Sequence, residues 1–521
     1  MRRRALIAGA TLPLLACSGE PPATGGFAGA SPERGHLLRS VRPPSAAAEV
    51  RRTGVVVAGA GVAGLAAARA LRQRGIDDFV VLELEDQAGG NSRAGRLGGI
   101  ACPLGAHYLP LPGDEAHEVQ DLLEELGLRR RVAGRWQYDE RHLCHSPQER
   151  LFFQGHWQEG LLPLQGVGPA TLAQYRRFGA RVRQLGRQAR FAIPVTRQPL
   201  QALQRALGGQ TFHDWLGREG LDDAQLRWYL DYCCRDDYGA GLDTVSAWAG
   251  IHYFASRHGF HVPGDGEADG REAVLTWPQG NGWLTQRLAL PLGDRLRTGR
   301  VVLRIAEQRH GVEVDAVDAA SGRAERWQAA HCVVALPAFV AARVLDPPPA
   351  FVRAAAAGLR YAPWVVANLH LDAPLRDQPG AAAAWDNVVY GGRGLGYVDA
   401  SHQSLNPAPG PTVLSWYQAP GEAARGDLLQ RPWQAWRDEV LAELEAPHPD
   451  LARRLRHVEV ARYGHAMAIP VPGSLAHVVT GAPRTARLGF AHADWAGYSV
   501  FEEAFCLGHA AGLRAAGRGV S

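Results

Sequence analysis

Residues 55–65 read Val55-Val56-Val57-Ala58-Gly59-Ala60-Gly61-Val62-Ala63-Gly64-Leu65, an apolar run followed by three glycines in the spacing G-x-G-x-x-G. A pattern of Ala, Leu and Arg that is typical of a helix continues to residue 74, where Gly75 ends it. A second apolar run, residues 79–82, then ends at an acid, Glu83. Strand, glycine turn, helix, strand and acid follow one another in the order that a βαβ unit needs to hold a dinucleotide.

Each residue of this unit has a physical role. Gly59 makes the tight turn, Gly61 lets the backbone approach a pyrophosphate, and Gly64 lets the helix pack closely on the strand. Val62 and Ala63 open the helix, whose N-terminus faces the phosphates. Glu83, at the end of the second strand, accepts a hydrogen bond from a ribose hydroxyl. The sequence therefore predicts a dinucleotide site formed by the following residues: Gly59, Gly61, Val62, Ala63, Gly64 and Glu83.

The residues after this strand indicate which dinucleotide is the cofactor. They read Leu82-Glu83-Leu84-Glu85-Asp86-Gln87-Ala88-Gly89-Gly90-Asn91-Ser92-Arg93. This run resembles the L-E-(x)n-G-G-R segment of the flavin-containing amine oxidase superfamily, which includes monoamine and polyamine oxidases, protoporphyrinogen oxidases and carotenoid desaturases. The resemblance implies FAD as cofactor, with Gly89 and Gly90 beside its phosphates and Arg93 nearby. Glu85 is a rival for the ribose, but Glu83 sits at the end of the apolar run and is preferred.

The far end of the chain resembles the same family. Residues 488–495 read Leu488-Gly489-Phe490-Ala491-His492-Ala493-Asp494-Trp495 and are similar to its closing strand, and residues 502–511 resemble its E-G-A-x-x-x-G-x-x-A-A helix. The resemblance implies that Asp494 holds the ribityl chain, that Val500 contacts the cofactor, and that the helix N-terminus stabilises charge on the reduced flavin. Two residues depart from the family pattern, because His492 and Glu503 each stand where the family has glycine.

Further matches at residues 277–284 and 330–337 keep the family's order along the chain. The resemblance thus implies an α/β fold in which a Rossmann-like FAD-binding domain is interleaved with a substrate domain of mixed, largely antiparallel sheet and helical insertion. We assign residues 51–112, 270–345 and 480–515 to the first domain, and 113–269 and 346–479 to the second. A chain of 521 residues is long enough to form more than one hydrophobic core.

The basic residues are all arginine, because the sequence contains no lysine. No lysine side chain can therefore form a Schiff base or hold a water beside flavin N5, a role that Lys plays in many amine oxidases of this family. The net charge of +4 is too small for this length to indicate nucleic acid binding. The cysteines and histidines follow no metal-ligand spacing, so no metal is expected.

The N-terminus has the pattern of an export signal. Arg2-Arg3-Arg4 precede a short apolar core, and Leu14-Leu15-Ala16-Cys17 resembles the lipobox of bacterial lipoproteins, in which Cys17 is acylated. The arginines also resemble a twin-arginine signal, which exports folded, cofactor-loaded proteins. We expect residues 1–17 to direct export and residues 18–50 to be a flexible tether. The protein would then be a periplasmic lipoprotein held to the membrane through Cys17.

Three side chains are candidates for catalysis. Tyr498, in Trp495-Ala496-Gly497-Tyr498, resembles the cage tyrosine of monoamine oxidases, although its spacing to the following helix differs. His465 and His492 could move protons near the flavin at neutral pH. The alternative for each histidine is a hydrogen-bonded structural role.

The sequence favours an exported FAD-dependent oxidoreductase that takes a hydride from the C–N bond of an amine, with O₂ or a quinone reoxidising the flavin. A first alternative is a desaturase or isomerase that acts on a lipid-like substrate. A second is a flavin-bearing binding or assembly protein without turnover. No feature of the sequence indicates an oligomeric state.

Overall fold

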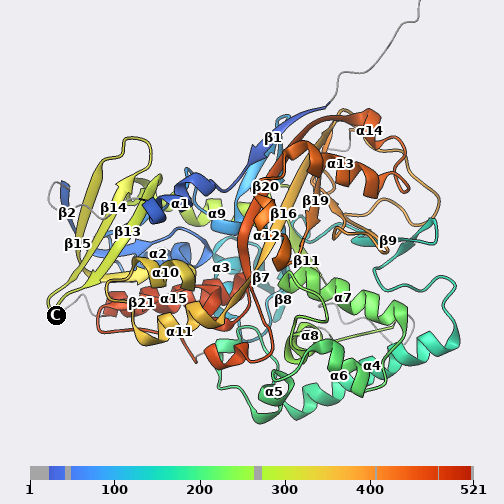
Figure 1. Ribbon diagram of the computed structural model, residues 1–521, viewed down its shortest axis with the longest axis horizontal. Coiled ribbons are helices and arrows are strands. Elements are labelled where there is room, and N and C mark those ends of the chain that lie inside the picture. Colours follow the sequence, from blue (N-terminus) through green and yellow to red (C-terminus); the bar gives the residue numbers. More distant parts are fainter. Residues whose placement is uncertain are drawn as a thin grey trace, which may run out of the picture.

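The computed structural model describes residues 23–40, 49–257, 259–262, 273–404, 408–478 and 480–517. The export signal expected at residues 1–17, with Cys17, lies outside these ranges. Two large sheets organise the described chain, one on each side of the view in Figure 1.

The first sheet has seven strands, which three separate segments of the chain supply. Its order is β12 (Leu296–Arg297), β3 (Phe79–Leu82), β2 (Glu49–Ala58), β15 (Ala324–Val334), β14 (Val312–Asp318) and β13 (Arg300–Glu307), and β21 (Leu488–Phe490) pairs with β15. The pairs among β12, β3, β2, β15 and β21 are parallel, whereas β13, β14 and β15 pair antiparallel. Helix α2 (Val62–Gln73) crosses from β2 to β3. The predicted Rossmann-like unit is confirmed.

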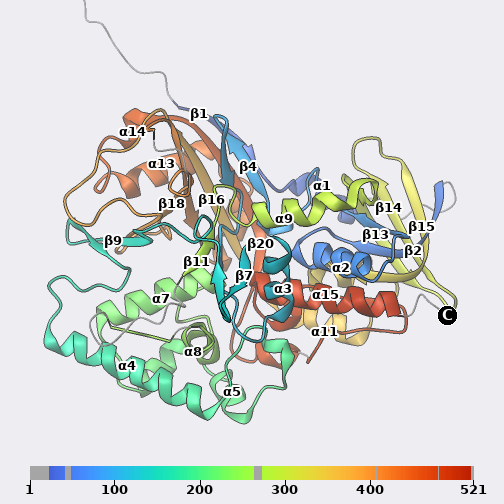
Figure 2. The same cartoon turned by 180° about the vertical axis from the view of Figure 1, so that it is seen from behind.

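Alternation along β2 explains how this sheet is covered on both faces. Val55 and Val57 pack in one core with α2 and α15 (Phe501–Gly517), while Val56 and Ala58 pack in another with α10 (Ala338–Val344) and α11 (Ala350–Gly358). Successive strand residues point to opposite faces, so a continuous apolar run requires a layer on each side. Figure 2 shows α2 and α15 lying side by side along their lengths.

The second sheet has eight strands and is mostly antiparallel. Its order is β1 (Thr24–Ala28), β20 (Leu455–Ile469), β16 (Arg360–Leu371), β19 (Thr412–Gln418), β18 (Tyr397–Asp399), β17 (Asp386–Val389), β9 (Glu149–Phe153) and β10 (His156–Glu159). Only the β1–β20 and β17–β9 pairs are parallel. This is the mixed, largely antiparallel substrate sheet that the resemblance implies.

Helices cover both faces of the second sheet. One face packs on α13 (Trp433–Leu444), and the other shares a core with a helical lobe. The lobe lies at the lower right of Figure 1 and consists of α4 (Pro169–Gln188), α5 (Ala202–Leu207), α6 (Phe212–Arg218), α7 (Ala224–Tyr238) and α8 (Ala247–Ala255). Helices α3 (His117–Glu125) and α9 (Gly282–Ala289) lie between the sheets in Figure 2, and the short strands β6 (Tyr108–Pro110) and β11 (Val274–Thr276) pair with each other.

The N-terminal segment differs from its expected form. Residues 24–28 are strand β1 and residues 32–40 are helix α1, although the whole of 18–50 is expected to be a flexible tether. The segment is held at both ends, because Thr24 Oγ1 lies 2.6 Å from His457 Nδ1 and Arg34 pairs with Asp86 at 2.8 Å. The tether prediction is therefore wrong for residues 24–40, which fasten one sheet to the other.

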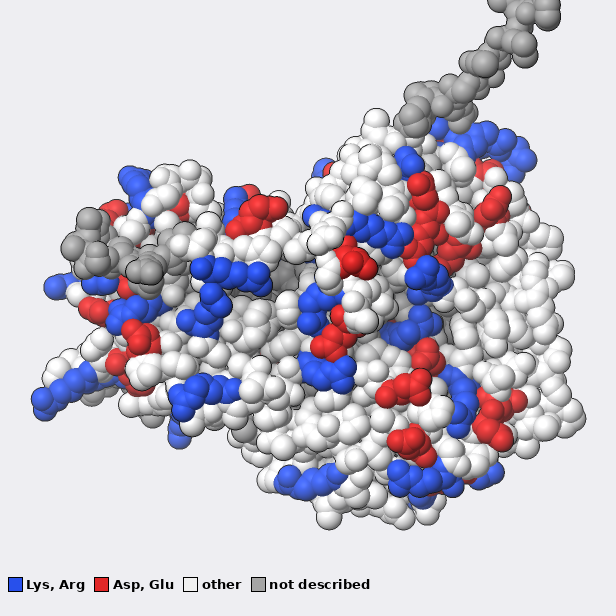
Figure 3. All heavy atoms as spheres, viewed as in Figure 1, with Lys and Arg blue, Asp and Glu red and all other residues white. Residues whose placement is uncertain are grey.

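The surface carries both signs of charge. Figure 3 shows arginines and acids interspersed over the face that it views. In the described ranges, no helix is both long and apolar enough to cross a bilayer.

Candidate active site

Two glycine-rich loops meet at the end of the first sheet, one that contains Gly61 and one that contains Gly89 and Gly90. Gly61 bridges to Gly89, and the Gly89 N–H donates to the Ala60 carbonyl at 2.8 Å. A Cβ at Gly61 would meet only the Gly90 Cα, at 3.9 Å, so this residue faces open space. The first and third glycines are instead closed in by backbone, since a Cβ would lie 2.5 Å from the Ala335 oxygen at Gly59 and 1.9 Å from the Gly59 oxygen at Gly64. Only Gly61 leaves room for a ligand.

Helix α2 begins at this open space. Its N-cap is Gly61, so no side chain caps the amides of its first turn, where Val62 and Ala63 lie. Uncapped amides at a helix N-terminus form a site for phosphate. The donor set therefore fits the pyrophosphate of a dinucleotide.

Glu83 lies beside this turn, as predicted, and is 6% exposed. Its carboxylate accepts the Ala60 N–H at 2.7 Å and the Glu85 N–H at 3.0 Å. Burial raises the pKa of Glu83 above its ordinary value, and the two amide donors oppose this shift. The rival acid, Glu85, instead accepts the Ser31 N–H at 2.9 Å and lies 3.7 Å from Arg93.

Arg93 stabilises the loop that contains Gly89 and Gly90. The side chain is buried and its Nε donates to the Gly90 carbonyl at 3.0 Å. Gly90 itself has a positive φ of 56°, a conformation that glycine adopts most easily. Arg93 therefore shapes the loop that forms one side of the cradle.

Asp494 lies in the short turn of residues 493–496 that follows β21 and is 1% exposed. Its Oδ2 accepts the Ala338 N–H at 2.8 Å and the Tyr361 hydroxyl at 2.7 Å, whereas no donor reaches Oδ1 from the described residues. Burial alone would raise the pKa of Asp494, but His492 and these hydrogen bonds hold it below its usual range. A buried carboxylate oxygen without a donor fits a ligand hydroxyl, as a ribityl chain would supply.

His492 lies beside Asp494, as strand alternation predicts. Its Nδ1 accepts the Asp494 N–H at 3.1 Å and stands 3.1 Å from Asp494 Oδ1, and 27% of the side chain is exposed. Nδ1 therefore faces both the amide and the carboxylate of Asp494. The imidazole thus caps the turn formed by residues 493–496.

His465 lies on β20, near the same carboxylate. Its ring contacts Phe339 at 4.7 Å and Tyr361 at 5.8 Å between centroids, and Tyr361 binds Asp494. The next residue, Ala466, accepts a hydrogen bond from the Asn91 amide at 2.5 Å. Burial and neighbouring arginines lower the pKa of His465, which favours a neutral imidazole at pH 7. His465, His492 and the cofactor loop therefore share one region.

Tyr498 is the third candidate for catalysis. It is fully buried, and its hydroxyl donates to Glu503 at 2.8 Å and lies 3.1 Å from His252 Nε2. The hydroxyl is thus held between α15 and the helical lobe, and a catalytic role for Tyr498 stays a prediction. Val500 is half-buried and directly precedes α15.

Glu503 explains the position of Tyr498. It lies in the first turn of α15 and is fully buried, and it also accepts the Val195 N–H. Burial raises the pKa of Glu503 to about 7, against the hydrogen bonds from Val195 and Tyr498. The acid that replaces a family glycine thus binds α15 to the helical lobe.

Helix α15 runs parallel to α2 and extends beyond its N-terminus. A Cβ at Gly508 would lie 2.0 Å from the Ala63 oxygen, and one at Gly512 would lie 2.4 Å from the Ala67 oxygen. The seven steps from Phe501 to Gly508 rise about 10 Å at 1.5 Å per residue. The first turn of α15 therefore projects past the phosphate end of α2, where the remainder of an extended dinucleotide would continue.

The sequence did not reveal an aromatic wall next to the cofactor loop. Ala106 N–H donates to the Asn91 carbonyl at 2.9 Å, and the next residue, His107, stacks on Tyr417 with centroids 4.2 Å apart. Burial lowers the pKa of His107 to about 3, so the ring is neutral. Tyr108 follows, and its hydroxyl donates to Asp236 at 3.3 Å. No motif marks these residues, since α7, β19 and the loop approach one another only in the folded chain.

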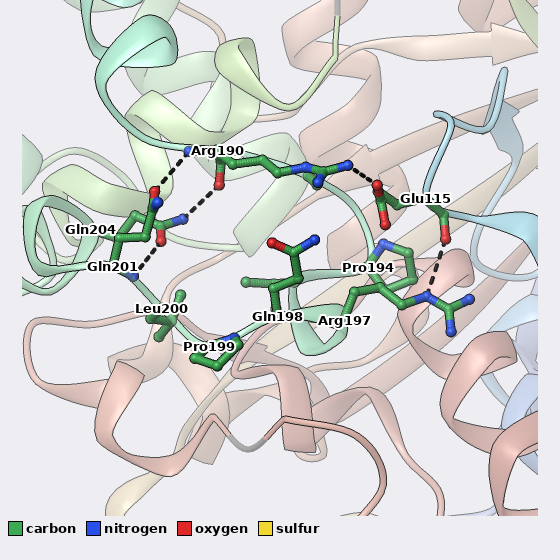
Figure 4. A pocket seen from close by; sticks show the side chains of 11 residues that line it. Glu115, Arg190, Pro194, Arg197, Gln198, Pro199, Leu200, Gln201 and Gln204 are labelled. Carbon is green, nitrogen blue, oxygen red and sulfur yellow. Dashed lines mark hydrogen bonds and ion pairs between the residues drawn. The ribbon is translucent and has the colours of Figure 1, made fainter.

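A separate pocket opens between the helical lobe and the N-terminal end of α3 (Figure 4). Its polar side chains bind one another, because Arg190 pairs with Glu115 and Gln204 Nε2 donates to the Arg190 carbonyl. Within the described ranges, no group of three or more His, Cys, Asp or Glu side chains is arranged to hold a metal ion.

Comparison with known proteins adds to this geometry. Residues 62–517 match a family model for flavin-containing amine oxidoreductases. An L-amino acid dehydrogenase of Synechocystis sp. is 26% identical over 306 residues, which cover 56% of this chain and 58% of that protein. The chain thus spans little more than half the length of that curated relative.

Solved structures show the same architecture. A putrescine oxidase bound to putrescine superposes with a TM-score of 0.68 at 17% identity, over 90% of this chain and 100% of that one. A fatty acid isomerase of P. acnes superposes with a TM-score of 0.57 at 14% identity, over 88% and 97% of the two chains. At these identities the likeness establishes a common fold.

Proposed function

The chain belongs to the flavin-containing amine oxidoreductase family, so its cofactor is FAD, and we propose that it oxidises the C–N bond of a small amine. The cradle fits this cofactor, because Gly61 faces open space at an uncapped helix end and Asp494 keeps one oxygen without a donor. The observation that carries the proposed reaction is the aromatic wall of His107, Tyr108 and Tyr417 beside the cofactor loop. Aromatic faces attract amines and their cations.

Bound FAD supplies an acceptor for a hydride, so the protein needs only to bind, orient and deprotonate the amine. The amine carbon loses the hydride and its nitrogen loses a proton, which gives an imine. Water then hydrolyses the imine to an aldehyde and ammonia. O₂ or a quinone takes up the electron pair in the second half of the cycle.

Two imidazoles lie in the region of Asp494. Burial lowers the pKa of His465 and so favours its neutral form, and His492 Nδ1 accepts the Asp494 N–H. No lysine exists to hold a water near the reacting centre. We propose His492 as the proton-handling group, with His465 as the alternative.

The proposal is tested by identifying the products of the reaction. Purified holoprotein is incubated in air, or with a quinone, and offered an aliphatic monoamine, a diamine, an L-amino acid or an unsaturated fatty acid. Consumption of the acceptor, with ammonia and an equal amount of aldehyde, or of a 2-oxo acid from the amino acid, is expected with at least one amine. A shift of a fatty acid double bond without acceptor consumption would identify an isomerase instead. A flavin that no substrate reduces would favour a binding protein.

We also propose that the protein is exported and anchored through an acylated Cys17. Support comes from the sequence alone, namely the arginines at residues 2–4, the short apolar core and the lipobox-like residues 14–17.

A further inference from the structure

We propose that residues 24–40 form a clasp that slows the release of FAD, in which Ser31 and Arg34 are positioning residues for the cofactor loop. The clasp consists of β1, α1 (Pro32–Ser40) and the residues between them. It precedes the residues that match the family model, which begin at residue 62. The inference depends on FAD as the cofactor and on no particular substrate, so it stands apart from the proposed amine oxidation.

The two ends of the clasp lie on different sheets. Strand β1 pairs in parallel with β20 at the edge of the substrate sheet, and a Cβ at Gly25 would lie 2.6 Å from the Trp433 ring of α13. Helix α1 packs with Leu38 against a core of β13 and β14, and the Arg343 side chain of α10 donates to the Leu38 carbonyl at 2.9 Å. Figures 1 and 2 both show α1 between the two sheets. The clasp therefore spans from one sheet to the other.

The middle of the clasp lies on the loop that follows β3. The Ser31 N–H donates to Glu85 Oε1 at 2.9 Å. The Arg34 guanidinium makes two contacts with the Asp86 carboxylate, of 2.8 and 3.0 Å, and donates to the Leu84 carbonyl at 3.4 Å. Two-pronged pairing of arginine with a carboxylate fixes orientation as well as distance. The clasp thus holds all three residues that follow the acid predicted to bind the ribose.

Glu85 connects the clasp to the cofactor cradle. Its N–H donates to Glu83 Oε1 at 3.0 Å, on the acid predicted to bind the ribose. Its Oε2 lies 3.7 Å from Arg93, which donates to the Gly90 carbonyl at 3.0 Å. A Cβ at Gly90 would lie 3.1 Å from the Gly61 Cα, so this loop lies directly against the glycine turn at the phosphate site. The clasp therefore fixes one wall of the cradle through Glu85.

A fixed wall retains a ligand, because the wall must open before the ligand leaves. Opening the loop of residues 84–93 breaks the contacts of Ser31 and Arg34 with it. Among variants of one binding site, differences in affinity lie mainly in the dissociation rate. The clasp is therefore expected to act on the rate at which FAD is released. Slow release would serve the export proposed above, because FAD lost outside the cytoplasm is not replaced.

Two neighbouring glycines of β1 provide a matched pair of variants. A Cβ at Gly25 would lie 2.5 Å from the Val458 oxygen, whereas a Cβ at Gly26 meets nothing within 4 Å. Gly25→Val should therefore detach β1 from β20, and Gly26→Val should leave it in place. Release of FAD from the holoprotein is followed as the rise of flavin fluorescence after dilution. Its rate is expected to increase about three- to tenfold in Gly25→Val and to stay unchanged in Gly26→Val.

Arg34 is tested by exchanging charges, which leaves the strand pairing of β1 intact. Arg34→Glu places a third acid beside Glu85 and Asp86 and should also speed FAD release. Adding Asp86→Arg restores a pair of opposite charges, and the release rate should return to within about twofold of the wild-type value. Arg187→Glu, at an exposed position of α4, is the control and should leave the rate unchanged.

Wild-type release rates in both Gly25→Val and Arg34→Glu would overturn the clasp. Equal acceleration in Gly25→Val and Gly26→Val would also overturn it, because the second variant has room for its side chain. If Gly25→Val does not fold, the charge exchange decides. Fast release in Arg34→Glu that Asp86→Arg reverses supports the clasp, and fast release that it does not reverse contradicts it. No substrate enters these measurements, so their outcome is independent of the proposed amine oxidation.

Discussion

At the scale of single residues, the cofactor side of the site depends on where a side chain has room. Gly59 and Gly64 are closed in by backbone atoms, whereas Gly61 faces open space at the start of α2. The chain therefore needs glycine at the first and third positions for packing, and at the second position for the ligand.

Gly61→Val should abolish FAD binding, because the new side chain would occupy the space in front of the α2 amides. The measurement is the flavin content of purified, folded protein. Gly113→Val is the control, since a Cβ at that exposed glycine meets nothing within 4 Å. Near-normal flavin in a folded Gly61→Val protein would contradict the assignment of this loop.

His492 can be tested with two substitutions. His492→Ala removes both the imidazole and the acceptor for the Asp494 N–H, at a cost of about 1 kcal/mol in stability. His492→Asn retains a side-chain oxygen that can cap this amide. If the imidazole moves protons, both variants should keep FAD and reduce it more slowly. A wild-type rate in His492→Asn would limit the residue to capping.

The sequence could predict which residues form the cofactor loop because they belong to one local segment. Gly61, Glu83 and Gly90 lie within 30 residues of one another, and their spacing alone places them together. The surroundings of Tyr498 could not be predicted, because distant residues set them. Glu503 is buried and needs donors, so it holds the Tyr498 hydroxyl between α15 and the helical lobe.

At the scale of elements, α15 is the part that connects the cofactor to the helical lobe. Gly508 and Gly512 seat it on α2, and Glu503 binds its first turn to Val195. The family's glycine would leave that turn without this link. The acid therefore contributes to stability in a way that depends on pH.

Replacing Glu503 with Gln should remove this dependence. The folded-state pKa of Glu503, about 7, lies above the ordinary 4.5, so its stabilisation is complete below about pH 4.5 and is lost as pH rises through about 7. The difference amounts to about 3 kcal/mol at most. Thermal unfolding of holoprotein from pH 5 to 8 should show the wild type losing stability relative to Glu503→Gln. Parallel curves would refute the buried, protonated acid.

The N-terminal segment shows where composition misleads. Residues 18–50 are rich in Pro, Ala and Gly, which is typical of a tether, yet Thr24–Ala28 pairs with β20. The edge of a sheet offers unpaired backbone groups, so even a glycine-rich strand can be held there. Such pairing depends on a partner more than 400 residues away in the chain, as the Thr24–Arg456 hydrogen bond shows, and no local pattern indicates it.

At the scale of the whole molecule, the order of motifs along the chain predicted two interleaved domains. Strands β2, β3, β15 and β21 form one sheet because the chain returns to it twice. The contact of His107 with Tyr417 could not be predicted in this way. His107 directly precedes β6 and Tyr417 lies on β19, and only the folded chain brings the two rings together.

Membrane attachment is a property of the whole protein in its cell. Cys17→Ser should move the protein from the membrane fraction to the soluble fraction while leaving its FAD content intact, because acylation needs the thiol. The measurement is fractionation followed by flavin analysis, with Cys144→Ser as a matched control outside the signal. Membrane association that survives Cys17→Ser would indicate an uncleaved anchor or binding through the protein surface.

Anaerobic titration of purified, yellow protein with an amine tests the central claim most directly. Oxidation of a C–N bond transfers an electron pair to the bound flavin, so its visible absorbance should bleach with amine and return when air is admitted. The account predicts this cycle with an aliphatic amine, at a flavin that dithionite can also reduce. A flavin that dithionite reduces but every amine leaves oxidised would contradict the account.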